Sequence, residues 1–315
     1  MSFLSKIRKF LNFGRHDVTT SIHVKTLLVR TNDLDQSKRF YHNTLGLDVL
    51  RDHNNSVLLA NQNTLMPLIE LRGPSKTSST RYSNANGETD DRLNEPQYHH
   101  IGFLLDTKRS WISFIHHILD QEIPITGTSE ANKTISFYIK DPDDNLLEFY
   151  TKKETKDHHH YPTRNFNEGH DIEWNLKQVL DTVDDDYVTS TYHFEIAHLH
   201  LQVSKLNAQT FRHFFVDGLK ALEIESYHPR TLNFKMGSLN ILITEVYSRR
   251  HNPRMTRQNL EPIIEFPTIG TVKKLTNDLL DLQFPCDVSE GETRTIVEGF
   301  TFVCTCPEAQ IVAKE

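Results

Sequence analysis

Cysteine is scarce in this sequence, which contains three cysteines among 315 residues. Cys286, Cys304 and Cys306 cannot all pair with one another, and none of them belongs to a Cys-x-x-Cys motif. Cys304 and Cys306 lie two residues apart in an expected strand and therefore share one face of it. We expect these two cysteines to be ordinary small side chains of the core or surface rather than ligands of a metal site. The reducing cytoplasm fits this cysteine content best.

An excess of basic residues is also missing, because 35 Lys and Arg stand against 42 Asp and Glu, with a formal net charge of −7 and a pI near 6.2. A nucleic-acid partner would need a clustered basic face, so none is expected. No stretch approaches the roughly 18 consecutive apolar residues that span a bilayer, and stable membrane insertion is not expected. The length suffices for two ordinary domains with a substantial core.

The first thirteen residues alternate apolar and basic side chains at helical spacing. Such a helix could touch an anionic membrane surface. Docking of the helix on its own domain, or on a partner subunit, is the commoner arrangement, so a homodimer stays open. A long apolar segment followed by a small-residue cleavage site is missing, and a signal peptide is not expected.

A weak repeat of about fifty residues occurs four times, each time in the order strand, helix, strand, strand, strand. In the first unit, Asp33-Leu34 opens the helix and Gly46 ends it. The strands expected in this unit are 22–30, 47–51, 57–61 and 66–72. A segment rich in Ser, Asn, Thr and charge, 75–96, is expected to be a surface linker.

The second unit repeats this order and ends in a hairpin. Its expected elements are strand 100–105, helix 110–121, strand 135–139 and strand 146–150. The last two strands are joined through Asp141-Pro142-Asp143-Asp144-Asn145. Asp and Asn tolerate the left-handed backbone conformation of tight turns, so a turn is expected there.

The last two units follow a polar stretch at 152–168 and an expected connecting helix at 171–183. The third unit consists of strand 196–203, helix 208–219 and strands 232–235 and 240–246. The fourth unit consists of a strand beginning at Ile263, helix 272–282, strand 295–304, a turn at Pro307-Glu308 and a final strand at 311–314.

One such unit leaves the concave face of its sheet uncovered, so units are expected to pair into an incomplete barrel around a cavity, an α+β fold. The chain then divides into four parts. These are an N-terminal extension, 1–19; a domain of two units, 20–152; a linker with a helix, 153–192; and a second domain of two units, 193–315.

The order of parts carries a family resemblance, together with two motifs: Asp33-Leu34…Phe40-Tyr41…Gly46-Leu47 and Asp141-Pro142…Asn145…Glu148. They resemble the vicinal oxygen chelate superfamily, which includes glyoxalase I, bleomycin-resistance proteins and type I extradiol dioxygenases. Over 20–315 the order is most similar to the two-domain, ring-cleaving catechol 2,3-dioxygenase branch of Gram-positive bacteria. The resemblance implies four βαβββ units paired into half-barrels. It specifies the fold better than the activity, because the superfamily hosts many functions.

The resemblance also implies a metal site. In the superfamily, ligands come from the first and last strands of a unit, and the first-strand ligand lies eight residues before the Leu that opens the helix. Counting back from Leu206 leads to His198, while His100 and Glu148 occupy the first-strand and last-strand positions of the second unit. Two imidazoles and a carboxylate suit a divalent metal, Fe(II) first and Mn(II) second, with positions left for substrate and oxygen.

Each of these assignments has an alternative. The chain contains 18 histidines, so one histidine at one position is weak evidence. His198 and His200 share a strand face, so either could be the inward ligand or a hydrogen-bonded core residue. Glu148 is stronger evidence, because a carboxylate among apolar neighbours is costly inside a barrel unless it has a partner.

The other units match the ligand pattern less well. Thr26 stands eight residues before Leu34, and Glu70 occupies the last-strand position of the first unit without a histidine partner. The fourth unit offers Glu265 and Glu315 but no histidine, so it is expected to be structural. Three consecutive histidines at 158–160 lie in the polar linker, where a solvated loop or adventitious metal binding is expected.

The proton-transfer groups are less complete than the ligands. Tyr138 matches a tyrosine that the ring-cleaving branch places near the second substrate hydroxyl, although an ordinary strand aromatic is an equal alternative. That branch has a histidine cluster in the last strand of its third unit, but 238–243 contains no titratable group here. The loop 130–133 also lacks the histidine that the branch carries. His200 or Lys133 could supply the missing acid–base function.

Three functions are compatible with this pattern, in the following order of preference. The first is a ring-cleaving dioxygenase acting on a catechol or hydroquinone. The second is a glyoxalase-type lyase or isomerase acting on a thiol adduct or another electrophile. It would need a fourth protein ligand, and Glu245 lies near that position. The third is a non-catalytic small-molecule-binding protein of the bleomycin-resistance type, which the missing histidines favour.

Overall fold

The computed structural model describes residues 23–74, 97–130, 134–153, 191–203, 205–226, 230–245, 260–289 and 292–306. The first unit comprises β1 (His23–Arg30), α2 (Leu34–Arg39) with the wider turn η2 (Phe40–Thr44), β2 (Asp48–His53), β3 (Ser56–Ala60) and β4 (Pro67–Arg72). The second unit comprises β5 (Gln97–Leu105), α3 (Lys108–Asp120), β6 (Gly127–Glu130), β7 (Thr134–Lys140) and β8 (Leu146–Lys152).

The third and fourth units have the same order. The third comprises β9 (Phe194–Val203), α5 (Ala208–Arg212) with η4 (His213–Gly218), β10 (Leu222–Ile224), β11 (Thr231–Met236) and β12 (Leu239–Glu245). The fourth comprises β13 (Leu260–Glu265), α6 (Ile269–Asp281), β14 (Cys286–Ser289), β15 (Glu292–Val297) and β16 (Phe300–Thr305). The fourfold unit is therefore confirmed.

Every one of these four α-helices begins at a side-chain cap. The capping oxygen accepts a hydrogen bond from the backbone N–H three residues further on, in Asp33, Thr107, Asn207 and Thr268. Such caps satisfy one of the free N–H groups of the first turn. In α3, one face then carries Trp111, Phe114, Ile115 and Ile118, all buried. This face packs against the aromatic side chains of the sheet, including Phe137 and Phe149.

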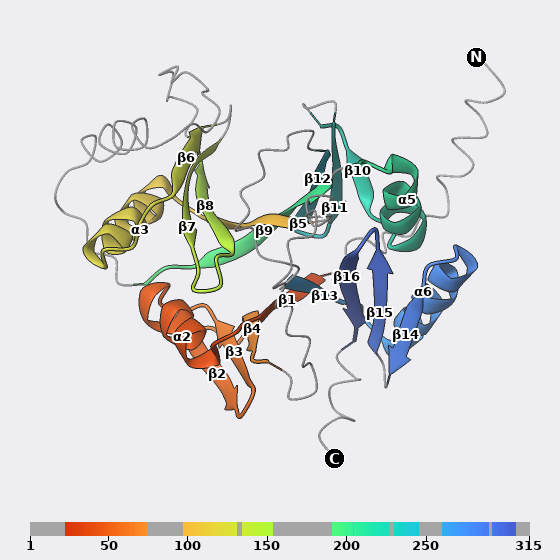
Figure 1. The fold of residues 1–315 in the computed structure, drawn as a ribbon, viewed down its shortest axis with the longest axis horizontal. Coiled ribbons are helices and arrows are strands. Elements are labelled where there is room, and N and C mark those ends of the chain that lie inside the picture. The colour runs from red at the N-terminus through yellow and green to blue at the C-terminus, as the bar shows by residue number, and fades with distance from the viewer. Residues whose placement is uncertain are drawn as a thin grey trace, which may run out of the picture.

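The strands form two eight-stranded mixed sheets, with α2 and α3 on one flank of the molecule and α5 and α6 on the other (Figure 1). The expected α+β class and the pairing of four βαβββ units are confirmed. One sheet has the order β14-β15-β16-β13-β1-β4-β3-β2, and the other has β10-β11-β12-β9-β5-β8-β7-β6.

The units pair across the middle of the chain. The first unit joins the fourth through the antiparallel pair β1–β13, and the second joins the third through β5–β9. Each sheet therefore takes one unit from each of the predicted domains 20–152 and 193–315, whose boundaries stay a prediction. Sequence patterns report local structure, whereas the choice of partner unit depends on contacts between residues far apart in the chain.

The two sheets are linked by the predicted turn after β7. The carboxylate of Asp141 accepts a hydrogen bond from the Tyr41 hydroxyl at 2.8 Å, and Asp143 accepts one from the Asn32 amide side chain at 2.7 Å. Tyr41 and Asn32 belong to the first unit, so the acidic turn of one sheet binds the helix that covers the other.

The fourth unit differs from its prediction. The expected continuous strand 295–304 is wrong, because β15 ends at Val297 and β16 begins at Phe300. Glu298 and Gly299 both have positive φ, 48° and 87°, which makes a two-residue hairpin turn between the strands. The Glu-Gly pair was the signal for this turn. Short strands β6, β10 and β14 were also missed.

Several predictions lie outside the described residues. They are the extension 1–19, the linker 75–96, the candidate acid–base residue Lys133, the three histidines 158–160, the helix 171–183, the turn at Pro307-Glu308, the strand 311–314 and Glu315. No helix in the described part of the chain is both long enough and apolar enough to cross a membrane.

Candidate metal centre

A row of side chains crosses five neighbouring strands of the second sheet. Tyr138 on β7 pairs with Glu148 on β8, which pairs with Gly102 on β5. Gly102 pairs with His198 on β9, and His198 pairs with Asn240 on β12. Residues paired directly across a sheet share a face. The row therefore gathers a carboxylate, an imidazole and a phenol on one face.

The trio, defined as His100, Glu148 and His198, converges on one point of this face. The Nε2 atoms of His100 and His198 lie 3.0 and 2.8 Å from the same oxygen, Oε2 of Glu148. The two Nε2 atoms are 2.9 Å from each other. Only 7% of His100 and 8% of Glu148 is exposed, so these polar groups face one another away from solvent. The structure thus brings together all three ligands predicted from the sequence.

Gly102 makes room for one of the trio. A Cβ atom at this position would lie 2.1 Å from Cε1 of His198, well inside van der Waals contact. The His198 ring therefore occupies the space above the Gly102 backbone and reaches across β5 toward Glu148. Glycine is needed here because of this close approach of a neighbouring side chain rather than for backbone conformation.

Burial and hydrogen bonding set the charges of these groups. Burial alone raises the pKa of Glu148, but electrostatic attraction to His100 and His198 and their hydrogen bonds outweigh burial and hold that pKa well below its usual range. Burial lowers the pKa of His100, against the opposing effect of Glu148. The site consequently combines an ionised carboxylate with a neutral imidazole at neutral pH, the protonation states in which both groups bind metal.

Tyr138 touches the trio directly. Its hydroxyl donates a hydrogen bond to Oε1 of Glu148 at 2.9 Å and lies 3.1 Å from the Ser129 hydroxyl. Burial, and then the charge of Glu148, raises the pKa of Tyr138, so the phenol keeps its proton. Oε1 of Glu148, the oxygen that does not contact the histidines, therefore accepts a hydrogen bond from a neutral phenol.

His200 stands beside the trio rather than in it. Its Nε2 lies 2.9 Å from the Thr244 hydroxyl, and its ring centroid lies 4.9 Å from that of His100. Burial, followed by the neighbouring histidines, lowers the pKa of His200 well below the usual value. The sequence left open whether His198 or His200 on β9 is the inward ligand. In the structure His198 contacts Glu148, and His200 contacts Thr244.

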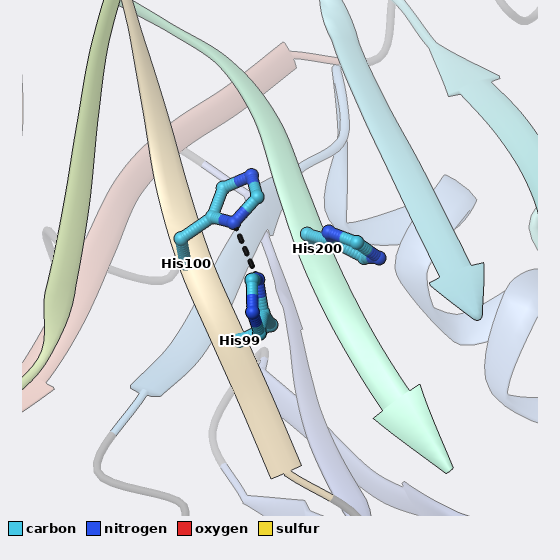
Figure 2. Close-up of side chains that lie close together, drawn as sticks. All are labelled: His99, His100 and His200. Carbon is cyan, nitrogen blue, oxygen red and sulfur yellow. Dashed lines mark hydrogen bonds between the residues drawn. The ribbon is translucent and has the colours of Figure 1, made fainter. Parts of the chain in front are cut away.

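His99 was not singled out from the sequence, because strand alternation places it on the opposite face from His100. The β5–β9 register shifts here: Tyr98 pairs with Leu201 and His100 with His200, which leaves His99 as an extra residue. Such a bulge redirects a side chain. The Nδ1 atoms of His99 and His100 lie 2.6 Å apart (Figure 2). Burial lowers the pKa of His99 to about 3.

The trio fits one first-row metal ion. Ligand atoms about 2.1 Å from one ion and at right angles to each other lie about 3.0 Å apart. The three separations of 2.8, 2.9 and 3.0 Å match that spacing. Two imidazoles and one carboxylate on one side of an ion form the donor set of non-haem Fe(II) sites.

β12 places no carboxylate at the position that could supply a fourth metal ligand. Leu242 pairs with His200 across the parallel pair β9–β12, as Glu148 pairs with Gly102 across β5–β8. Glu245 pairs with Val203 and stands three residues from Leu242, so it points to the other face of the sheet. Among the described residues, β12 therefore adds no ligand to the trio.

The corresponding face of the first sheet holds ion pairs instead. Leu28 pairs with Glu70 on one side and Glu261 on the other. Arg72 binds Glu70 at 2.6 Å, while Arg30 and Arg294 bind the two oxygens of Glu261 at 2.7 and 2.6 Å. These carboxylates are neutralised by arginine. Thr26, at the position predicted to lack a ligand, is buried.

Comparisons with known proteins agree with this architecture. Residues 23–149 match the sequence model of the Glyoxalase/Bleomycin resistance protein/Dioxygenase superfamily. Searching the curated proteins gave no significant match.

Solved structures share the fold over nearly the whole chain. A proposed dioxygenase from Bacillus subtilis subsp. subtilis str. 168 aligns with a TM-score of 0.58 and 7% identity, over 90% of this chain and 84% of that one. Glyoxalase I from Zea mays aligns with a TM-score of 0.56 and 11% identity, over 93% and 95%. The family match covers residues 23–149, which is less than half of the chain, and the solved structures show the same vicinal oxygen chelate fold over nearly all of it.

Proposed function

We propose that this protein is an extradiol-type dioxygenase that opens the ring of a catechol or hydroquinone, with Fe(II), or Mn(II) in its place, held by the trio. The observation that supports it most is the convergence of His100 and His198 on one oxygen of Glu148, at 3.0 and 2.8 Å. Three protein ligands leave open positions for one or both oxygens of the diol and for O₂. A small aromatic molecule is accordingly the proposed partner, and the cytoplasm the proposed location.

The side chains around the trio have distinct roles in this proposal. Bound Fe(II) would supply Lewis acidity toward the diol and the electrons that activate O₂. Glu148 offsets part of the metal charge, and His100 and His198 offer neutral nitrogens. Tyr138 keeps its proton, donates a hydrogen bond to Glu148 and can hold a substrate oxygen beside it. His200 is the proposed acid–base group, since Thr244 holds its Nε2 and leaves Nδ1 to exchange a proton with the substrate hydroxyl.

The residues on β12 support the glyoxalase alternative less well than the dioxygenase proposal. A glyoxalase-type site would need a fourth protein ligand, often a glutamate that also serves as base. Leu242 stands opposite His200 on β12, and Glu245 is on the other face of the sheet. This favours a site with three protein ligands and several open positions.

Oxygen consumption tests the proposal. Metal-free protein would be loaded with Fe(II) under nitrogen, mixed with catechol, 4-methylcatechol, hydroquinone or methylhydroquinone, and then exposed to air in an oxygen electrode. We expect oxygen uptake with at least one diol and a new absorbance from a ring-opened product. Glu148→Gln should abolish both signals. The matched control is Glu223→Gln, which removes an exposed ion pair with Arg212.

Two results would contradict the proposal. Isomerisation of a hemithioacetal without oxygen uptake would identify the glyoxalase alternative. Tight binding of an aromatic ligand to the Fe(II)-loaded protein, with neither reaction, would identify a binding protein.

A further inference from the structure

Three histidines form a second cluster beside the trio. This second cluster contains no carboxylate. The triad, defined as His99, His100 and His200, comes from the adjacent strands β5 and β9 (Figure 2). The ring centroid of His200 lies 4.9 Å from those of both His99 and His100. One ring nitrogen from each residue lies within 4.8 Å of the other two. The three rings therefore face one small volume, and a small shift of the side chains would bring a nitrogen of each to one ion.

Two of the three rings have an oxygen at the nitrogen that faces away from the cluster. Nε2 of His100 lies 3.0 Å from Glu148, and Nε2 of His200 lies 2.9 Å from the Thr244 hydroxyl. The Thr244 hydroxyl lies 2.8 Å from that of Thr231 and can donate to it, which leaves its oxygen to accept from His200. Metal-binding histidines almost always donate their second N–H to such an oxygen, which fixes the tautomer.

His100 belongs to both clusters but can serve only one at a time. Its Nε2 faces Glu148 and His198, while its Nδ1 faces His99 at 2.6 Å. A neutral imidazole has one N–H and one lone pair. When its lone pair is on Nε2, His100 can bind a metal ion at the trio, and its Nδ1–H donates a hydrogen bond to His99. When its lone pair is on Nδ1, His100 can bind a metal ion at the triad, and its Nε2–H donates a hydrogen bond to Glu148.

We propose that His99, His100 and His200 form a second divalent-metal site, suited to Zn²⁺, whose occupation excludes a metal ion from the trio. Three imidazoles without a carboxylate suit Zn²⁺ or Cu²⁺, whereas the carboxylate of the trio suits Fe(II) and Mn(II). A metal at the triad takes the lone pair of His100 away from the trio and occupies the His200 nitrogen assigned to proton transfer. Zn²⁺ at the triad is thus an inhibitor of the proposed reaction.

Variants that keep only one of the two sites test this inference. Glu148→Gln with His198→Ala removes two ligands of the trio but leaves an amide oxygen for the Nε2–H of His100. His99→Ala with His200→Ala removes the triad and leaves the trio. All proteins would be tag-free and carry serine at 158–160, so that neither added nor linker histidines bind metal. His213→Ala, at an exposed histidine on η4, is the matched control.

The readout is Zn²⁺ per chain after equilibrium dialysis, with circular dichroism and melting temperature to show that each variant is folded. We expect one Zn²⁺ in each double variant, one and not two in the wild type and the His213→Ala control, and none when both pairs of substitutions are combined. The first double variant tests the triad without the trio, so its result does not depend on whether the protein is a dioxygenase.

Two outcomes would overturn the inference. A folded Glu148→Gln/His198→Ala protein that binds no Zn²⁺ would show that the triad is not a metal site. Two Zn²⁺ ions in the wild type would show that the sites fill together and that His100 does not restrict them to one ion.

Discussion

Gly102 lies directly opposite His198 in the β5–β9 pair, and the imidazole occupies the position where a Cβ atom of residue 102 would be, with Cε1 at 2.1 Å. The metal ligand on one strand therefore depends on the missing side chain of its neighbour. The same glycine pairs with Glu148 on its other side, so the imidazole passes over it toward the carboxylate.

The first prediction concerns this relationship. Gly102→Ala should displace the His198 ring and weaken Mn(II) or Fe(II) binding by about 10- to 100-fold, as loss of a supporting group around a metal site does. Isothermal titration with Mn(II) measures the change. The control is Gly270→Ala, whose added methyl group has no neighbour closer than 3.7 Å and whose metal binding should not change. Equal affinity in the Gly102→Ala protein would show that His198 is not a required ligand.

The second prediction separates metal binding from catalysis. Tyr138→Phe removes the hydroxyl that donates to Glu148 at 2.9 Å but leaves the ring and all three ligands in place. We expect unchanged metal content and a kcat for oxygen uptake lower by about 10²-fold, the lower end of the usual acid–base contribution. Tyr192→Phe, which loses a hydroxyl near Ser113, is the control and should keep its kcat. A Tyr138→Phe enzyme with full kcat would assign Tyr138 to the core alone.

The trio could be predicted because its members occupy the strand positions at which the family that the sequence resembles places its ligands. His100 and Glu148 lie on strands whose boundaries were predicted within three residues, so those positions could be identified along the chain. His198 and His200 share a strand face, so the alternation of side chains does not distinguish them. Their separate roles depend on Gly102 and Thr244, which lie on neighbouring strands.

The triad could not be predicted because it depends on an irregularity. His99 reaches the site face through one extra residue in β5, and a second register shift occurs between Gly102 and Phe103. Bulges have no fixed sequence signal, although they are frequent next to functional sites. The pairing of the first unit with the fourth is likewise a property of long-range contacts, whereas each local hairpin is a property of its own turn residues.

The third prediction concerns the contact between the two sheets. Asn61, directly after β3, donates a hydrogen bond to the carbonyl of Phe194 and accepts one from its N–H, both at 2.8 Å. Asn61→Ala leaves these partly buried backbone groups without that partner and should lower the free energy of unfolding by about 1–3 kcal/mol. Urea denaturation measures the loss. Asn207→Ala, at an exposed helix cap, is a comparison confined to one helix, with an expected loss of about 1 kcal/mol. An unchanged Asn61→Ala protein would show that this link does not stabilise the fold.

The fourth prediction is a pH dependence of stability that originates at Asp141. Burial raises the pKa of this carboxyl to about 6, although hydrogen bonds from Asn145 and Tyr41 oppose the shift. Its unfolded value is about 3.9. Because the folded state binds the proton more tightly, the stabilisation is complete below about pH 4 and is lost as the pH rises through about 6. The loss amounts to about 3 kcal/mol for two pKa units, as an upper estimate.

The difference in unfolding free energy between the wild type and Asp141→Asn isolates this contribution, because other titrating groups cancel between the two proteins. From pH 4 to 7 the wild type should lose stability relative to the Asp141→Asn variant, whatever the difference between them at pH 4. Asp144→Asn is the matched control, since Asp144 lies in the same turn, pairs with Lys140 at the surface and already has the positive φ that asparagine tolerates. Its difference from the wild type gives the baseline for removing a carboxylate from this turn. A difference for Asp141→Asn that follows this baseline would mean that the Asp141 carboxyl keeps an ordinary pKa and that its hydrogen bonds fully offset its burial.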